Sequence, residues 1–296
     1  MIEFSGIWPI LYAFFGPDGQ LDREAMRLQV EACVKVGAPG IAVLGLATEV
    51  HKLTPEERET VMCWAVEDLQ GRAPLAVTVA GPDASTQQEF ARKAQSLGAS
   101  WLILQPPSRR PLEDAECLQH FDEVMAAIDM PLAIQNAREY LGVGLSLAQI
   151  LELRSRHPHF VLLKGEGPSV EMQETVQATG GALRVFNGRG GLELTDSLRA
   201  GCSGIIPAPE LVDRQLEVER LLRSGQDAEA EAQYREILPA IVFVMQSIPH
   251  LLCYGKRILA HRLGLDVFDR EPFQAPTEFG LERVRYFAEH LGPLPH

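Results

Sequence analysis

Short apolar runs recur along the chain and alternate with longer amphipathic stretches, and this alternation restricts the possible folds more than any other feature. Each run has three to six residues and is rich in Val, Ile or Leu, so it is too short for a helix. Continuous apolar character is typical of parallel strands that are covered on both faces. The runs are 7–12, 41–44, 75–79, 101–104, 132–134, 160–163, 183–186 and 204–206.

The stretches between the runs carry helical signals. Segment 22–36 has apolar residues at helical spacing among charges, and the segment that starts at Thr54 has Pro at the first helical position. A glycine that stops a helix and directly precedes a strand run occurs three times, at Gly37, Gly98 and Gly201. Such joints are expected between a helix and the next strand of a repeating βα unit.

Eight βα units in about 210 residues match the size of a (β/α)8 barrel of the TIM type. We therefore expect an α/β fold with the barrel over residues 1–225 and a C-terminal helical extension over 226–296, packed on the barrel within the same domain. The extension should supply two or three helices beyond the eighth barrel helix. A doubly wound sheet is the alternative, but it usually has fewer strands, and no GxGxxG motif follows the first run.

Charge and composition exclude several classes of partner. The formal net charge is −13, so neither nucleic acid nor a membrane surface is an expected partner. The five cysteines have no CxxC spacing, which indicates neither a zinc site nor disulfides. The N-terminal residues lack the build of a signal peptide, and stretch 237–254 is too interrupted by proline and polar residues to span a membrane. We expect a cytoplasmic protein in which that stretch is a buried or interface helix.

Lys164 directly follows the apolar run 160–163 and is one of only five lysines. A lysine in such a place loses hydration of its charge unless the amine is neutral or paired. A neutral amine attacks ketones to form a Schiff base. Glu166 shares a face with Lys164 if the backbone stays extended, which would make it a proton shuttle or an ion partner. A lysine that extends to solvent and a solvated loop acid are the alternatives.

Other strand ends carry candidate binding residues, because reacting groups of this fold lie at the carboxyl ends of the strands. The loop after the second run is built of small residues whose backbone N–H groups suit a carboxylate. Gln135 and Asn136 form a polar pair after the fifth run, and Arg189 in a glycine-rich loop could pair with an acid group. Ordinary turn chemistry is the alternative for each. The candidate substrate-binding residues are Gly45, Leu46, Ala47, Thr48, Asn136, Gly188, Arg189 and Ile206.

These segments together resemble the dihydrodipicolinate synthase / N-acetylneuraminate lyase superfamily over nearly the whole chain. The resemblance is carried by GLATE (45–49), LTPEER (53–58), PLAIQN (131–136), LKGE (163–166), NG (187–188) and GCSG (201–204). It implies a TIM barrel, usually a homotetramer, that binds a 2-keto acid on a Schiff-base lysine at the end of strand six, which falls on Lys164. No cofactor is expected, because the lysine supplies the electron sink. No metal is expected from the spacing of the eight histidines.

Three departures from the family pattern bear on the activity. Leu46-Ala47-Thr48 stands where the family usually has hydroxyl residues and glycine, Gln135 stands where it has a tyrosine that relays protons, and residues 105–108 lack a further tyrosine. An amide does not titrate, so Gln135 cannot act as an acid or base by itself. The departures argue against both dihydrodipicolinate synthase and sialic acid lyase activity.

The pattern is more similar to the 2-keto-3-deoxy-L-arabinonate dehydratase branch, which has Gln and a short polar residue after strand five and Glu two residues after the lysine. That resemblance implies a hydro-lyase in which Lys164 forms the imine and Glu166 is base or acid, with Gln135 and Asn136 holding a water. Two alternatives stay open: a pyruvate-releasing aldolase of the same family and a non-catalytic keto-acid-binding protein. Residues expected to shape the pocket are Tyr12, Thr78, Gln105, Tyr140 and Arg189.

Overall fold

The computed structural model describes residues 3–108 and 112–296, and its centre is a closed sheet of parallel strands. The strand order is β1-β8-β7-β6-β5-β4-β3-β2. A parallel bridge between Ile10 and Ala42 joins the two ends of this order, so the sheet closes into a barrel. Every strand lies beside its sequence neighbour, whereas the order of a doubly wound sheet reverses partway. The predicted (β/α)8 barrel is confirmed.

The strands match the predicted apolar runs closely. The strands are β1 (Gly6–Ile7), β2 (Ile41–Val43), β3 (Leu75–Val79), β4 (Trp101–Leu104), β5 (Leu132–Asn136), β6 (Phe160–Gly165), β7 (Arg184–Asn187) and β8 (Gly204–Ile205). The first run is the exception, because Pro9 has no N–H to donate and interrupts the ladder. The chain beyond β1 nonetheless stays beside β8, where Ile10 N donates to Pro207 O over 2.8 Å.

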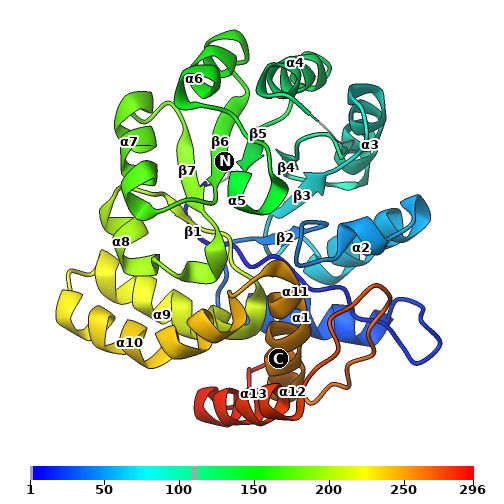
Figure 1. Cartoon of the computed structure of the whole chain (residues 1–296), viewed down its shortest axis with the longest axis vertical. Helices are drawn as coiled ribbons and strands as arrows, with labels where there is room; N and C mark the ends of the chain where they lie inside the picture. Colours follow the sequence, from blue (N-terminus) through cyan, green and yellow to red (C-terminus); the bar gives the residue numbers. More distant parts are fainter. Residues whose placement is uncertain (1–2, 109–111) are drawn as a thin grey trace.

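Helices follow the strands and surround them (Figure 1). The helices between strands are α1 (Arg23–Lys35), α2 (Pro55–Leu69), α3 (Ala84–Leu97), α4 (Asp114–Met125), α5 (Arg138–Leu141), α6 (Leu147–Arg156), α7 (Ser169–Thr179) and α8 (Leu194–Arg199). Short turns are η1 (Val50–Lys52), η2 (Arg189–Gly191) and η3 (Pro209–Leu211). Thr54 caps α2 as the sequence predicts, in a capping box with Glu57, and α3 ends at Gly98 with a φ of 106°.

The C-terminal helices gather along one side of the barrel, in yellow to red in Figure 1. They are α9 (Val212–Arg223), α10 (Asp227–Val244), α11 (Ile248–His250), the π-helical turn η4 (Leu251–Gly255), α12 (Lys256–Leu263) and α13 (Glu278–Leu291). Helix α9 is the eighth barrel helix, and α10, α12 and α13 are the three longer helices of the extension.

The apolar stretch 237–254 is not one helix, as the sequence had suggested, but is divided between α10, α11 and η4. Its members Ile241 and Leu251 are buried. Among the described residues, no single helix has the length and apolar character needed to cross a membrane. The α10 helix and segment 248–263 meet that requirement only as a pair, bent by 108°.

Aromatic side chains fill the amino-terminal part of the barrel interior. Trp8, Trp101 and Phe186 are buried, and their ring centroids lie 5.3 to 6.4 Å apart. The barrel is therefore a packed core rather than a pore. Phe186 is the register neighbour of Lys164, so the aromatic packing ends where the polar residues of the barrel mouth begin.

Candidate active site

Lys164 lies near the carboxyl end of β6 and is buried, although it is a charged residue. Its register neighbour on β5 is Gln135, so the two side chains point to the same face of the sheet. The Lys164 Nζ atom lies 2.8 Å from Glu166 Oε1. A buried lysine is either neutral or paired with an opposite charge, and in this structure Lys164 is paired with a carboxylate.

Glu166 is held by more than the lysine. Gln135 Nε2 donates to Glu166 Oε1 over 2.6 Å, and Gln105 Nε2 donates to Gln135 Oε1 over 2.9 Å. Gln87 in turn donates to the backbone oxygen of Gln105 over 3.1 Å. The polar ends of β4, β5 and β6 thus form one hydrogen-bonded chain that ends on the carboxylate. This chain fixes the position of the one titratable group beside the lysine.

Glycine at position 188 leaves room for that carboxylate. A Cβ atom on Gly188 would lie 2.7 Å from Glu166 Cγ, which is closer than side chains approach. Gly188 therefore contributes to the site by its missing side chain.

The loop after β2 presents backbone donors to the barrel mouth. Leu44 and Glu49 on either side of it have positive φ values of 65° and 54°. Among the described residues, the N–H groups of Leu46, Ala47 and Thr48 have no hydrogen-bond acceptor. The Thr48 hydroxyl points back into the protein and donates to Leu11 O over 2.6 Å. These free N–H groups form the kind of turn that binds carboxylates.

A buried ion cluster supports this loop from behind. Glu49, directly after Thr48, pairs with Lys52 at 2.5 Å and with Lys256 of α12, and all three side chains are buried. Burial lowers the pKa of Lys256, and the charge of Glu49 opposes that shift. The cluster ties the loop to the C-terminal extension, so the extension helps to position the binding turn.

Two asparagines brace loops beside the site. Asn136 exchanges hydrogen bonds of 3.0 and 2.8 Å with the backbone of Leu145, and Asn187 Nδ2 donates to Gly167 O over 3.0 Å. The amide of Asn136 is thus engaged with the backbone. Its predicted role in holding substrate stays a prediction, and the geometry gives it a bracing role.

Arg189 and Tyr140 lie at the mouth of the site. Arg189 has a left-handed backbone with a φ of 54°, and its nearest carboxylate contacts are 3.4 Å to Glu193 and 3.7 Å to Glu139. Burial and then the charge of Glu166 raise the pKa of Tyr140, while a hydrogen bond with Arg189 opposes the rise. Tyr140 is therefore protonated near neutral pH and is close enough to Glu166 to feel its charge.

A cavity of about 30 Å³ joins these residues. The predicted residues that line it are Leu46, Ala47, Lys164, Glu166, Arg189 and Ile206. Gln135, Gly45, Thr48, Asn136 and Gly188 are adjacent in the chain or in contact with lining residues but do not line it. Residues that the sequence did not indicate also line it: Ile10, Gly190, Ala208, Met245, Ile248 and Leu251.

Two of the residues expected to shape the pocket lie elsewhere. Tyr12 is fully buried and donates to Glu210 Oε2 over 2.9 Å, away from the cavity lining. The Thr78 hydroxyl is buried without a partner and faces Gly45, where an added Cβ would lie 3.4 Å from it. Both residues support the loops around the site rather than its lining.

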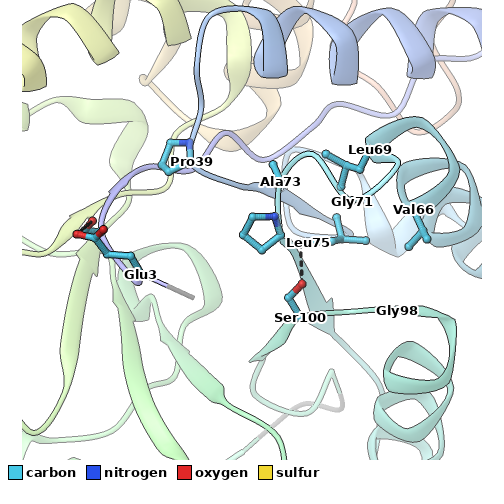
Figure 2. Close-up of a pocket in the computed structure, with 11 residues that line it drawn as sticks. Glu3, Pro39, Val66, Leu69, Gly71, Ala73, Leu75, Gly98 and Ser100 are labelled. Carbon is cyan, nitrogen blue, oxygen red and sulfur yellow. Dashed lines mark hydrogen bonds between the residues drawn. The ribbon is translucent and has the colours of Figure 1, made fainter. Parts of the chain in front are cut away.

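A larger hollow of about 590 Å³ lies at the opposite end of the barrel, where β3 begins at Leu75 (Figure 2). Helix ends such as Leu69 and Gly98 line it, and Ser100 accepts a hydrogen bond from the Leu75 backbone there. Among the described residues that line it, Glu3 alone is titratable. The hollow therefore lacks the paired groups that acid-base chemistry needs.

The described part of the chain has no group of three or more histidine, cysteine, aspartate or glutamate side chains placed to hold a metal ion. The spacing His157-Pro-His159 is of the HxH type, but its rings have other partners. His157 contacts Asp122 at 2.8 Å and His159 contacts Met125 O at 3.1 Å. These histidines connect the turn between α6 and β6 to α4.

Known proteins match this chain along most of its length. The dihydrodipicolinate synthetase family matches residues 3–290. An L-2-keto-3-deoxyarabonate dehydratase of Azospirillum brasilense is 26% identical over 80% of this chain and 78% of its own. A protein of Escherichia coli K12 named "putative 2-dehydro-3-deoxy-D-gluconate aldolase" is 25% identical over 79% and 80% of the two chains.

Solved structures agree with the sequence match. A crystal structure described as a "putative dihydrodipicolinate synthetase" from Pseudomonas aeruginosa has a TM-score of 0.91 and 26% identity, and the match covers 98% of this chain and 100% of that one. Family and fold therefore agree over the barrel and the C-terminal helices alike. The chain belongs to the dihydrodipicolinate synthetase family of Schiff-base lyases.

Proposed function

We propose that this protein removes water from a 2-keto-3-deoxy sugar acid through an imine on Lys164. The observation that carries the proposal is the 2.8 Å contact between Lys164 Nζ and Glu166 Oε1 in a buried site. A nucleophilic amine and a carboxylate within proton-transfer distance are the two groups that this reaction needs. The similarity to an L-2-keto-3-deoxyarabonate dehydratase supports the choice of reaction.

Imine formation uses the ion pair directly. The proton of the Lys164 ammonium passes to Glu166, and the neutral amine attacks C2 of the keto acid. Glu166 returns the proton to the hydroxyl of that adduct, which leaves as water and gives an iminium beside the ionised carboxylate. The free N–H groups of residues 46–48 hold the substrate carboxylate. The positive iminium withdraws electrons from C3 and makes a C3 proton acidic.

Elimination follows on the same carboxylate. Glu166 takes a proton from C3, and the electron pair forms an enamine with C2. The enamine expels the C4 hydroxyl, which takes the proton from Glu166 and leaves as water. Hydrolysis of the unsaturated iminium returns the free Lys164 amine, so the net change is the loss of one water from the substrate. Gln135 and Gln105 hold the carboxylate still during both transfers.

An aldolase reaction on the same imine is the second candidate, and the relative named as an aldolase favours it. In that reaction a base takes the proton of the C4 hydroxyl, and the C3–C4 bond breaks to give an aldehyde and an enamine. C3 of the enamine then takes up the proton from that base, and hydrolysis of the resulting iminium releases pyruvate. Glu166 is again the base within reach. The two reactions differ in their products and not in their first intermediate.

Borohydride trapping tests the imine. The protein is incubated with pyruvate or 2-keto-3-deoxy acids, reduced, and analysed by intact mass spectrometry with peptide mapping. We expect an adduct on Lys164, none in Lys164→Arg, and an unchanged adduct in Lys93→Arg, whose lysine is exposed and paired with Glu59. Failure to trap any acid in a folded sample would refute the proposal and favour a non-catalytic binding protein.

Product analysis separates the two reactions. With 2-keto-3-deoxy-L-arabinonate as substrate, a product lighter by one water supports the dehydratase. Release of pyruvate supports the aldolase instead. An adduct without either product identifies a protein that binds keto acids as imines but does not turn them over.

A further inference from the structure

The site cavity shares one lining residue with a second, much larger cavity. The site cavity of about 30 Å³ and a cavity of about 390 Å³ are both lined by Ile248. Ile248 is the first residue of α11, which lies between the barrel and α12 (Figure 1). Among the residues described for the two cavities, it is the only one common to both.

The chain around Ile248 forms a wall with two faces. Met245 and Leu251 line the site cavity, whereas Leu252 and Cys253 line the larger one. The backbone of this wall is fixed, because the Ser247 hydroxyl accepts a hydrogen bond of 3.2 Å from His250 N and Pro249 follows Ile248. Ile248 is therefore the residue at which the two cavities meet, on a segment whose backbone is capped.

The larger cavity suits an apolar group. Its charged side chains are already engaged, since Glu49 pairs with Lys52 and Lys256, and Asp269 pairs with Arg257. Of the other lining residues, Ile248, Pro249, Leu252, Pro272 and Phe273 form an apolar part of the wall, whereas His51 and Gln274 are polar. An alkyl chain that entered there would meet apolar surface and displace no ion pair.

We propose that Ile248 is a specificity-determining residue that limits the chain length of the 2-keto acid. The inference rests on the proposed imine at Lys164. The Ile248 side chain then closes the path along which a longer alkyl tail would reach the second cavity. Truncation of Ile248 joins the cavities and admits longer 2-keto acids.

Borohydride trapping with an alkyl series tests this. The proteins compared are wild type, Ile248→Ala, Ile248→Val and Leu252→Ala. Each is incubated with pyruvate, 2-oxobutyrate, 2-oxohexanoate or 2-oxooctanoate and then reduced with borohydride. The ratio of 2-oxooctanoate adduct to pyruvate adduct is measured. We expect Ile248→Ala to raise this ratio at least tenfold over wild type, and Ile248→Val to raise it less. Leu252→Ala enlarges the second cavity without opening the wall, so its ratio should equal that of wild type.

The outcomes separate the two proposals. If all proteins trap pyruvate but Ile248→Ala gains nothing for the long acid, or Leu252→Ala gains as much, the role of Ile248 is refuted while the imine stands. If no protein traps pyruvate, the imine itself is refuted. Thermal unfolding of each variant is measured alongside. Ile248 is only partly buried, so Ile248→Val remains a usable variant if Ile248→Ala fails to fold.

Discussion

The side-chain amide of Gln135 donates a 2.6 Å hydrogen bond to Oε1 of Glu166. The family pattern has a proton-relaying tyrosine at this place on strand five, and an amide there orients a neighbour without exchanging protons. The titratable group beside Lys164 is instead supplied from the end of β6 by Glu166. The lysine and the carboxylate are thus two residues apart, Lys164 within β6 and Glu166 directly after it.

Replacing Glu166 with glutamine should separate imine formation from turnover. The amide keeps the shape of the side chain but transfers no proton, so kcat should fall by roughly 10²- to 10⁴-fold. Borohydride should still trap pyruvate on Lys164, but more slowly, because the lysine has lost the carboxylate that takes its proton. Glu174→Gln, on an exposed part of α7, is the control and should match wild type in both assays. Full turnover by Glu166→Gln would remove Glu166 from the mechanism.

Gly188→Ala should impair turnover by displacing the Glu166 carboxylate. The added methyl group would lie 2.7 Å from Glu166 Cγ and force the carboxylate away from Lys164 and Gln135. We expect kcat to fall about tenfold or more, since small misplacements of a catalytic group are costly. Gly167→Ala is the control, because its new methyl group meets the ends of two flexible side chains, Glu171 Oε2 at 3.1 Å and Met172 Cε at 3.3 Å. Equal kcat values for the two variants would contradict the steric argument.

Arg189→Gly should raise stability and lower activity together. An arginine with a φ of 54° is strained by about 1 kcal/mol, and glycine relieves the strain while it removes the guanidinium from the cavity lining. The free energy of unfolding in urea should rise, and KM should rise as well. Gln70→Gly relieves a similar φ of 49° at the end of α2, so it should gain stability with unchanged kinetics. An unchanged KM in Arg189→Gly would place Arg189 outside substrate binding.

Glu210 should make the free energy of unfolding depend on pH. Burial raises its pKa from 4.5 to about 7, so the folded protein holds this proton more tightly than the unfolded chain does. The resulting stabilisation is complete below pH 4.5 and is lost as the pH rises through 7, with a total on the order of 3 kcal/mol.

Urea unfolding of wild type and Glu210→Gln at pH 5 and pH 8 measures this effect. Glutamine keeps a partner for the Tyr12 hydroxyl and does not titrate, so the variant should lose less stability than wild type between the two pH values. The exposed Glu229→Gln variant should behave as wild type does. Parallel pH dependences for wild type and Glu210→Gln would show that the buried carboxyl does not contribute.

The barrel was accessible to sequence analysis because its strands are continuous apolar runs bounded by glycine joints. Strands β3 and β4 begin and end at the predicted residues 75–79 and 101–104. The predicted bounds of the first strand were less accurate, since an apolar run does not reveal that Pro9 interrupts the ladder. The helix expected over 237–254 was wrong in the same way, because the bend after Val244 separates two apolar segments that look continuous in sequence.

The site was only partly accessible for a different reason. Lys164 and Glu166 are two residues apart, so strand geometry alone suggested their contact, and the structure has it. Met245, Ile248 and Leu251 reach the cavity only because the C-terminal extension folds back over the barrel mouth. No local pattern encodes that tertiary contact, and for that reason the wall of the cavity was absent from the sequence-based site.

The single carboxylate beside Lys164 also has a stereochemical consequence. If Glu166 both removes the C3 proton and protonates the departing C4 hydroxyl, it works from one side of the planar enamine. Both groups must then leave from that same side, so the elimination is syn and one of the two prochiral C3 hydrogens is always lost. A substrate deuterated stereospecifically at C3 would retain or lose its label completely, and that outcome would record the side on which Glu166 lies.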